Sequence, residues 1–206
     1  MLQWRVTVSL NMRGETLVRL DQKSARRIAT GVLKAEDQEV KTAIASLESR
    51  SSKGMAQTGS PVRRRLEETV KQAFGDTLIG GGWSSRTYIY FVFEVLKVAD
   101  GMPLQLAING WFFNTRSNAE KVSQVALITM HAMERLMERR YDADLVRLAR
   151  DEFDMDFVST LVFGKDGKRP SVNEEFKIRT THGWACGIVS ETGLPIVRTW
   201  IHKPGE

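Results

Sequence analysis

His131 is the side chain whose position most directly suggests chemistry, because it lies outside the apolar face of an expected helix. Between residues 121 and 140 the apolar side chains recur with a helical period, at Val122, Val125, Ala126, Met130, Met133, Leu136 and Met137. His131 lies on the opposite face, and a histidine outside the core exchanges protons readily near neutral pH. The pattern predicts either a general acid or base, or an ordinary solvated helix face on which His131, Glu134 and Glu138 accompany Arg135.

Later segments offer the groups that would complete a site for cleaving RNA without a metal ion. Arg135 follows His131 by one helical turn, so the two side chains project from the same face. Arg179 and His182 lie in an expected long strand, and Thr199 lies in the expected last strand. The chemistry needs one group to remove the 2′-hydroxyl proton, another to protonate the leaving oxygen, and an arginine to stabilise the phosphorane. These residues supply a histidine, an arginine and a hydroxyl or second base.

The run from His131 to Arg139, His-Ala-Met-Glu-Arg-Leu-Met-Glu-Arg, resembles the His-Ala-x-x-Arg-x-x-x-Arg helix of the barnase/EndoU/colicin/RelE-like nuclease superfamily. In that family the helix precedes an antiparallel sheet whose strands carry arginine and serine or threonine. Here the sheet would span residues 157–202, and Ile-Val-Arg-Thr-Trp at 196–200 is similar to the family's last strand. The resemblance implies a metal-independent ribonuclease with catalytic residues His131, Arg135, Arg179 and Thr199, and His182 joins them on position alone.

The resemblance covers the C-terminal part of the chain, and this sequence departs from the family in two respects. The family helix usually lies near the start of the domain, whereas a large region precedes it here. The expected strands within residues 87–113 have no counterpart in the family.

A basic charge balance is the main compositional signal. The chain has 206 residues, 42% hydrophobic and 27% charged, which are ordinary globular values. Its net charge of +5 favours an acidic partner, most commonly nucleic acid, although the same charge also serves solubility. The predicted contacts to a nucleic-acid backbone are Arg26, Arg27, Arg63, Arg64 and Arg65. The last three occupy the first turns of an expected helix, where the dipole disfavours cations, so they indicate an anionic ligand or a solvated face.

Cysteine usage and motif content argue against disulfides, cofactors and metal sites. Cys186 is the only cysteine, so an internal disulfide and a thiolate zinc site are excluded, and its strand-like surroundings indicate a buried, inert thiol. The sequence contains no phosphate-binding loop, His-Glu-x-x-His motif or calcium loop, and we expect no cofactor and no metal. The N-terminus does not resemble a signal peptide, and no apolar run reaches the ~20 residues of a membrane span, which predicts a cytoplasmic protein.

Hydrophobic patterning predicts an α+β fold in two parts. A mostly helical, basic region at 1–80 would precede a mainly antiparallel sheet with one long packed helix at 81–206. Gly80-Gly81-Gly82 is interpreted as a flexible joint between them. The first part is expected to contain a hairpin within 1–20, helices at 21–33, 36–48 and 61–74, and a linker at 49–60. The second is expected to contain helices at 121–140 and 143–152 and strands at 87–98, 104–113, 157–163, 176–189 and 195–202.

Three functional hypotheses follow. The first is a cytoplasmic, metal-independent endoribonuclease of toxin or phage-defence type, with His131 as general acid or base and an inhibitory protein as a compatible partner. The second is a non-catalytic nucleic-acid-binding or regulatory protein of a phage or mobile element, whose arginine clusters contact the backbone. The third is a protein-interaction module whose polar helix face meets an acidic partner. RNA is the favoured nucleic acid, no membrane contact is expected, and homo-oligomers are compatible with all three hypotheses.

Overall fold

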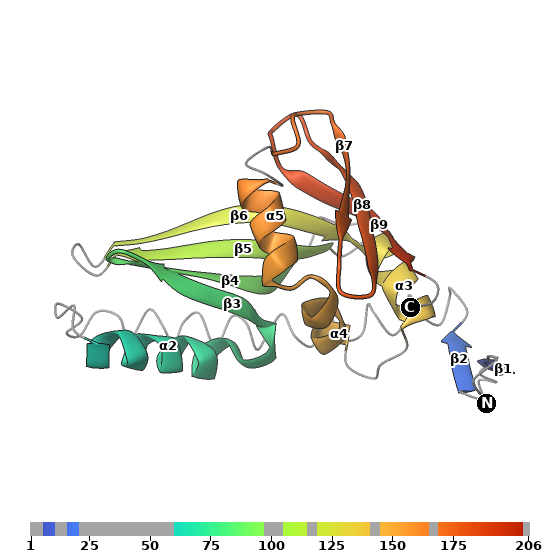
Figure 1. Ribbon diagram of the computed structural model, residues 1–206, viewed down its shortest axis with the longest axis horizontal. Helices are drawn as coiled ribbons and strands as arrows, with labels where there is room; N and C mark the ends of the chain where they lie inside the picture. Colours follow the sequence, from blue (N-terminus) through green and yellow to red (C-terminus); the bar gives the residue numbers. More distant parts are fainter. Residues whose placement is uncertain are drawn as a thin grey trace.

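Two antiparallel meanders, which meet through one parallel pair of strands, form the main sheet (Figure 1). The computed structural model describes residues 6–10, 16–20, 60–96, 105–114, 119–140, 145–164 and 169–203. The first meander contains β3 (Leu78–Ser84), β4 (Thr87–Leu96), β5 (Gln105–Asn114) and β6 (Ala119–Thr129). The second contains β7 (Glu175–Arg179), β8 (Gly183–Val189) and β9 (Pro195–His202), and the order across the sheet is β3-β4-β5-β6-β9-β8-β7.

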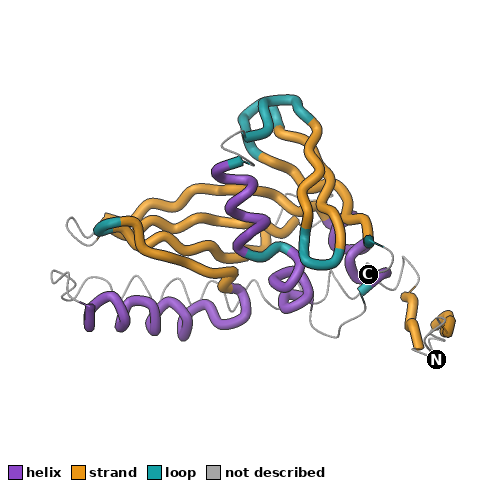
Figure 2. The backbone as a smooth tube through the Cα atoms, viewed as in Figure 1, coloured by secondary structure: helices purple, strands orange, loops and turns teal. Residues whose placement is uncertain are grey.

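Helices accompany both meanders. α2 (Ser60–Phe74) and a short 3₁₀ turn (Gly75–Thr77) precede β3. A parallel strand pair requires a long connection, and the one between β6 and β9 contains α3 (Met130–Arg139), α4 (Leu145–Glu152) and α5 (Met155–Phe163). Figure 2 shows α2 running along the first meander and the other helices gathered where the two meanders meet. β1 (Val6–Leu10) and β2 (Thr16–Leu20) form a separate antiparallel pair, as predicted for a hairpin.

The first meander is packed on both faces. On one face, α2 covers an aromatic layer from β4 and β5 that contains Tyr88, Tyr90, Trp111 and Phe113. Tyr90 and Trp111 stack with their ring centroids 6.0 Å apart and their planes at 8°. Alternate residues of the same strands, such as Phe93 and Ile108, enter a larger core with α3, α5 and β9. None of the described helices is long and apolar enough to cross a membrane.

The α+β class and the mainly antiparallel sheet are confirmed for the described part of the chain. The expected elements at 61–74, 87–98, 104–113, 143–152 and 195–202 correspond to α2, β4, β5, α4 and β9. The expected helices at 21–33 and 36–48, the linker at 49–59, and Arg26 and Arg27 lie outside the described residues.

The expected helix at 121–140 is wrong over its first half. Residues up to Thr129 form β6, and only Met130–Arg139 is helical, as α3. The run Val-Ala-Leu-Ile-Thr at 125–129 favours strand structure, and β6 pairs with β5 from Ala119 to Thr129 with one register shift at Val125. Thr129 then begins α3 as its N-cap, because its Oγ1 accepts a hydrogen bond of 3.3 Å from the Ala132 N–H.

Two predictions in the C-terminal part are also wrong. The expected strand at 157–163 is helix α5, whose N-cap Asp154 accepts a 3.0 Å hydrogen bond from the Phe157 N–H. The expected single strand at 176–189 is two strands, β7 and β8, joined by a tight turn at Thr181 and His182. The Thr180 N–H donates to the Gly183 carbonyl across this turn at 2.9 Å. Alternation alone continues through such a turn, so the sequence pattern did not reveal it.

The glycine triplet is part of β3, not a flexible joint. Gly80, Gly81 and Gly82 pair with β4, and the residue before them, Ile79, packs against the larger core. A Cβ on Gly81 would lie 2.8 Å from the Ile89 carbonyl oxygen and 2.8 Å from Tyr90 Cβ. The expected division at residue 80 therefore falls inside a strand, and α2 packs on the same sheet.

Substitution within the triplet distinguishes a packed strand from a joint. Gly81→Ala should lower the free energy of unfolding by about 1–3 kcal/mol, because the new methyl group meets β4. Gly82→Ala is the matched control, since a Cβ there meets nothing within 4 Å, and should be neutral or slightly stabilising. Denaturant unfolding of both variants measures the difference. Equal free energies of unfolding for Gly81→Ala and Gly82→Ala would contradict the packing described for Gly81.

Candidate active site

Glu152 is a fully buried carboxylate at the C-terminus of α4, and polar groups of the second meander surround it. Its side chain is 0% exposed. Oε1 lies 2.6 Å from His182 Nδ1 and 3.6 Å from Arg140 Nη1. Oε2 accepts hydrogen bonds from Thr180 Oγ1 at 2.9 Å and from the His182 N–H at 3.1 Å. Burial of a carboxylate is costly unless donors replace water, and these groups supply that replacement.

The chain order explains how the turn and the carboxylate meet. α4 ends at Glu152, and Asp154 begins α5 two residues later. Besides capping α5, Asp154 accepts a 3.2 Å hydrogen bond from Thr181 Oγ1 through its second oxygen. Trp200 of β9 donates from Nε1 to Thr180 Oγ1 at 3.0 Å. The β7–β8 turn is thus fastened to both helices and to β9.

The His182 ring is hydrogen-bonded to Glu152 through Nδ1 and is partly exposed to solvent. A carboxylate only accepts hydrogen bonds, so His182 Nδ1 must carry the proton that it shares with Glu152. The side chain is nevertheless 42% exposed. A histidine oriented in this way through Nδ1 leaves Nε2 available to exchange a proton with a bound molecule.

A second histidine lies beside this pair. His202 is the register partner of Gly183, and its ring lies 5.7 Å from that of Trp200. Burial lowers the pKa of His202, and Arg140 and Arg139 lower it further. Glu152 and a hydrogen bond to the main chain of His182 oppose this shift in part. Because its pKa lies below 6.5, His202 is mainly neutral at pH 7 and can accept a proton.

The structure separates His131 from this cluster. His131 is 49% exposed near the N-terminus of α3, with Nδ1 3.6 Å from the buried Glu134. Arg135 pairs with Glu138 at 2.9 Å on the same helix. His182 instead shares Glu152 with Arg140, which lies just after the C-terminus of α3. Roughly 13 Å of helix axis separates the two ends of α3. His131 and Arg135 therefore share one surface, while His182 belongs to another.

The other predicted site residues lie on the strands of the second meander. Arg179 is exposed on β7, and Thr199 is opposite Cys186 in the register of β9 and β8. Burial raises the pKa of the Cys186 thiol, with partial opposition from Lys177, as befits an unreactive cysteine. No cluster of histidine, cysteine and carboxylate side chains suited to a metal ion occurs within the described ranges.

The arginine cluster of α2 is partly occupied by contacts within the fold. Arg63 donates to the Ser85 carbonyl at 2.8 Å, and its guanidinium lies 4.8 Å from the centre of the Trp83 ring. Arg64 pairs with Glu68 at 2.9 Å on the helix surface. Arg65 is exposed.

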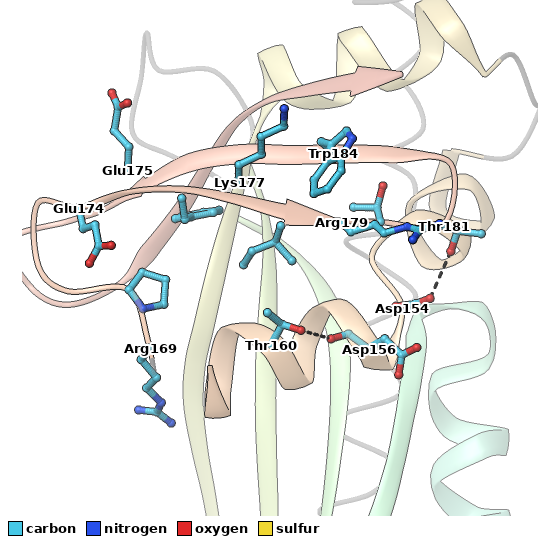
Figure 3. A pocket seen from close by; sticks show the side chains of 14 residues that line it. Asp154, Asp156, Thr160, Arg169, Glu174, Glu175, Lys177, Arg179, Thr181 and Trp184 are labelled. Carbon is cyan, nitrogen blue, oxygen red and sulfur yellow. Dashed lines mark hydrogen bonds between the residues drawn. The ribbon is translucent and has the colours of Figure 1, made fainter. Parts of the chain in front are cut away.

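A cavity of about 910 Å³ adjoins the β7–β8 turn (Figure 3). It lies between α5 and β7, and Thr180, Thr181 and Arg179 belong to its wall. Figure 3 shows Thr181 hydrogen-bonded to Asp154 at one end of it.

Sequence reasoning missed Glu152, although one signal was present. Leu148, Ala149 and Glu152 recur at the spacing of one helix face, so a carboxylate lies in line with apolar residues. Such a carboxylate requires a partner from elsewhere in the chain.

Comparison with family models, with curated proteins and with solved structures gave no match to this chain. The resemblance to the nuclease superfamily therefore stays a prediction from the residues of the His131 segment.

Removal of the carboxylate tests its structural role. Glu152→Ala should lower the free energy of unfolding by about 3 kcal/mol, because Arg140, Thr180 and the turn lose their common acceptor. Glu68→Ala removes an exposed pair and should change stability by about 0.5 kcal/mol or less. Urea unfolding of both variants gives the comparison. A similar small effect for Glu152 would contradict the described cluster.

The electrostatics of His202 can be read from its titration. The NMR midpoint of its ring should lie below 6.5, and Arg139→Gln should raise it by removing a nearby positive charge. Arg64→Gln, on the distant α2, should leave the midpoint unchanged.

The unfolded chain binds the His202 proton at higher pH than the folded chain does. The contribution of His202 to stability is therefore lost as the pH falls below 6.5. A midpoint at or above 6.5 would refute this description.

Proposed function

We propose that this chain is a metal-independent endoribonuclease of toxin or phage-defence type that acts at the Glu152–His182 site. The observation that carries the proposal is the 2.6 Å pairing of the buried Glu152 carboxylate with His182, whose ring is 42% exposed. Enzymes use this arrangement to fix an imidazole for proton transfer. The predicted chemistry is kept, while the leading histidine becomes His182 in place of His131.

The two neighbouring histidines suit the two proton transfers of RNA cleavage. The neutral His202 accepts the proton of the 2′-hydroxyl as its oxygen attacks the adjacent phosphorus. The bond from phosphorus to the 5′-oxygen then breaks, and the imidazolium form of His182, which keeps its Nδ1–H on Glu152, gives its Nε2 proton to that leaving oxygen. The proton gained by His202 returns to His182 through solvent before the next cleavage. The products are a 2′,3′-cyclic phosphate and a 5′-hydroxyl, and no metal or redox partner is required.

Cationic groups beside the histidines suit the phosphate. Arg140 lies 3.6 Å from Glu152, and both Arg140 and Arg139 act electrostatically on His202. Positive charge at this position would attract the RNA backbone and stabilise the phosphorane. On the His131 surface the nearest carboxylate, that of Glu134, lies 3.6 Å from the ring nitrogen, which makes that surface a weaker candidate.

The cellular location and an inhibitory protein partner are part of the same proposal. An enzyme that degrades cellular RNA acts in the cytoplasm and requires an inhibitory protein partner until its activity is needed. The net charge of +5 and the resemblance of the His131 segment to the nuclease superfamily support a nucleic-acid substrate.

Cleavage of a mixed RNA pool in EDTA tests the proposal. Wild-type protein should cleave, and His182→Asn should reduce the rate by about 10²–10⁴-fold, because it removes the proton-exchanging nitrogen. Asparagine keeps an N–H donor near the position of Nδ1, so the Glu152 contact and the fold should persist. His131→Ala is the matched control and should cleave at nearly the wild-type rate.

The outcomes separate the hypotheses. Equal cleavage by wild type and His182→Asn would refute the site, and selective loss in His131→Ala would return the role to His131. Folded wild-type protein that binds RNA in a salt-dependent way without cleaving it would favour the non-catalytic alternative.

A further inference from the structure

β7 is an edge strand whose free main-chain groups can be identified from its pairing with β8. The Thr180 N–H bonds to the Gly183 carbonyl, and the Val189 N–H bonds to the Glu174 carbonyl. Hydrogen-bonded residues alternate along an antiparallel pair, so the even-numbered residues of β7 bond to β8. The main-chain groups of Glu175, Lys177 and Arg179 therefore face away from β8. Within the described ranges, no other strand pairs with that side.

Space is available beside this edge. The cavity of about 910 Å³ extends along β7, and α5 forms its opposite side with Asp156 and Thr160 (Figure 3). The register between β7 and β8 has no shift, so the edge has no bulge to prevent a further strand from pairing. An edge of this kind accepts an additional strand through main-chain hydrogen bonds.

We propose that the added strand is β7 of a second copy of this chain, antiparallel and centred on Lys177. The sequence Glu-Phe-Lys-Ile-Arg at 175–179 is self-complementary in that register. Glu175 lies opposite Arg179 of the second copy, and Phe176 lies opposite its Ile178. The three residues with free main-chain groups then form three hydrogen-bonded pairs, each of which exchanges two N–H···O bonds.

The charges agree with this register. Glu175 and Arg179 are both exposed on the same face of β7, where opposite charges on directly opposed residues stabilise a sheet. The central position would oppose two lysines, but the Lys177 ammonium lies over the Trp184 ring of β8, 4.9 Å from its centre. This contact directs the charge away from the two-fold axis.

Exposed charges on an edge strand often serve to prevent association, and that is the competing interpretation. Lysine on the edge and charges that point inward are common protective features. Here the order acid, base, base places opposite charges together at both ends of the pairing. The proposal does not depend on ribonuclease activity, because it rests on the main-chain pairing and the charges of β7 and not on the His182 ring.

Charge reversal in the full-length chain tests the pairing. Light scattering and sedimentation should give twice the mass of one chain for wild type. Glu175→Arg or Arg179→Glu alone should weaken association more than tenfold, because like charges would then oppose each other. An equimolar mixture of the two variants should regain dimers, since one chain then carries arginine at both positions and faces a partner that carries glutamate at both. Both side chains are exposed, so thermal unfolding should show intact folds.

A main-chain variant gives an independent measurement. Lys177→Pro removes an N–H that faces away from β8, so it should abolish dimers and spare the β7–β8 pair. Lys177→Ala is the control that keeps the N–H and should remain dimeric. A monomeric wild type from micromolar to hundreds of micromolar concentration would overturn the proposal. So would dimers that survive Lys177→Pro, or a mixture of the charge variants that stays monomeric.

Discussion

Glu152 is a charged group removed from water, and much of the second meander is arranged to satisfy it. The carboxylate lies at the end of α4, whereas its donors come from the end of α3 and from the turn between β7 and β8. Because a buried charge without donors costs several kcal/mol, the helices and the turn cannot separate independently. Asp154 and Trp200 extend the same network to α5 and β9 through Thr181 and Thr180. The helices of the crossover are thereby held to β9 and to the β7–β8 turn.

The buried Glu152 carboxylate also determines which histidine has its ring oriented for proton transfer. His182 lies in a two-residue turn, a position that would ordinarily leave a side chain free, and the carboxylate fixes its ring. His202, a neighbour across the β8–β9 pairing, has its pKa lowered by burial and by Arg140 and Arg139. Proton exchange between groups held in this way is the basis of the proposed ribonuclease activity. His131 has an exposed ring and a longer contact to Glu134, at the far end of α3.

Sequence reasoning recovered the elements that local signals define. Ser60 and Pro61 predicted the start of α2, and the β-branched, aromatic run at 87–98 predicted β4. It failed where tertiary pairing outweighs periodicity, as at Val122 and Ala126, which fit a helical stripe but pair with β5 as part of β6. It also missed the turn at Thr181 and His182, because the hydrogen bonds that stabilise it come from Glu152, distant in the sequence. His182 was predicted as a site residue, while its partner Glu152 was not, since the spacing of one helix cannot reveal a contact with another element.

The protonation state of the His182 ring is the most direct test of the proposed Glu152–His182 site. Long-range ¹H–¹⁵N spectra of the histidine-labelled full chain report which ring nitrogen carries the proton. We expect a slowly exchanging proton on Nδ1, because that nitrogen donates to Glu152 at 2.6 Å, and an Nε2 without a proton when the ring is neutral. The signal should be assigned by its loss in His182→Asn. A ring whose Nδ1 proton exchanges freely with water, or a neutral ring with its proton on Nε2 instead of Nδ1, would show that Glu152 does not hold His182 and would contradict the proposed site.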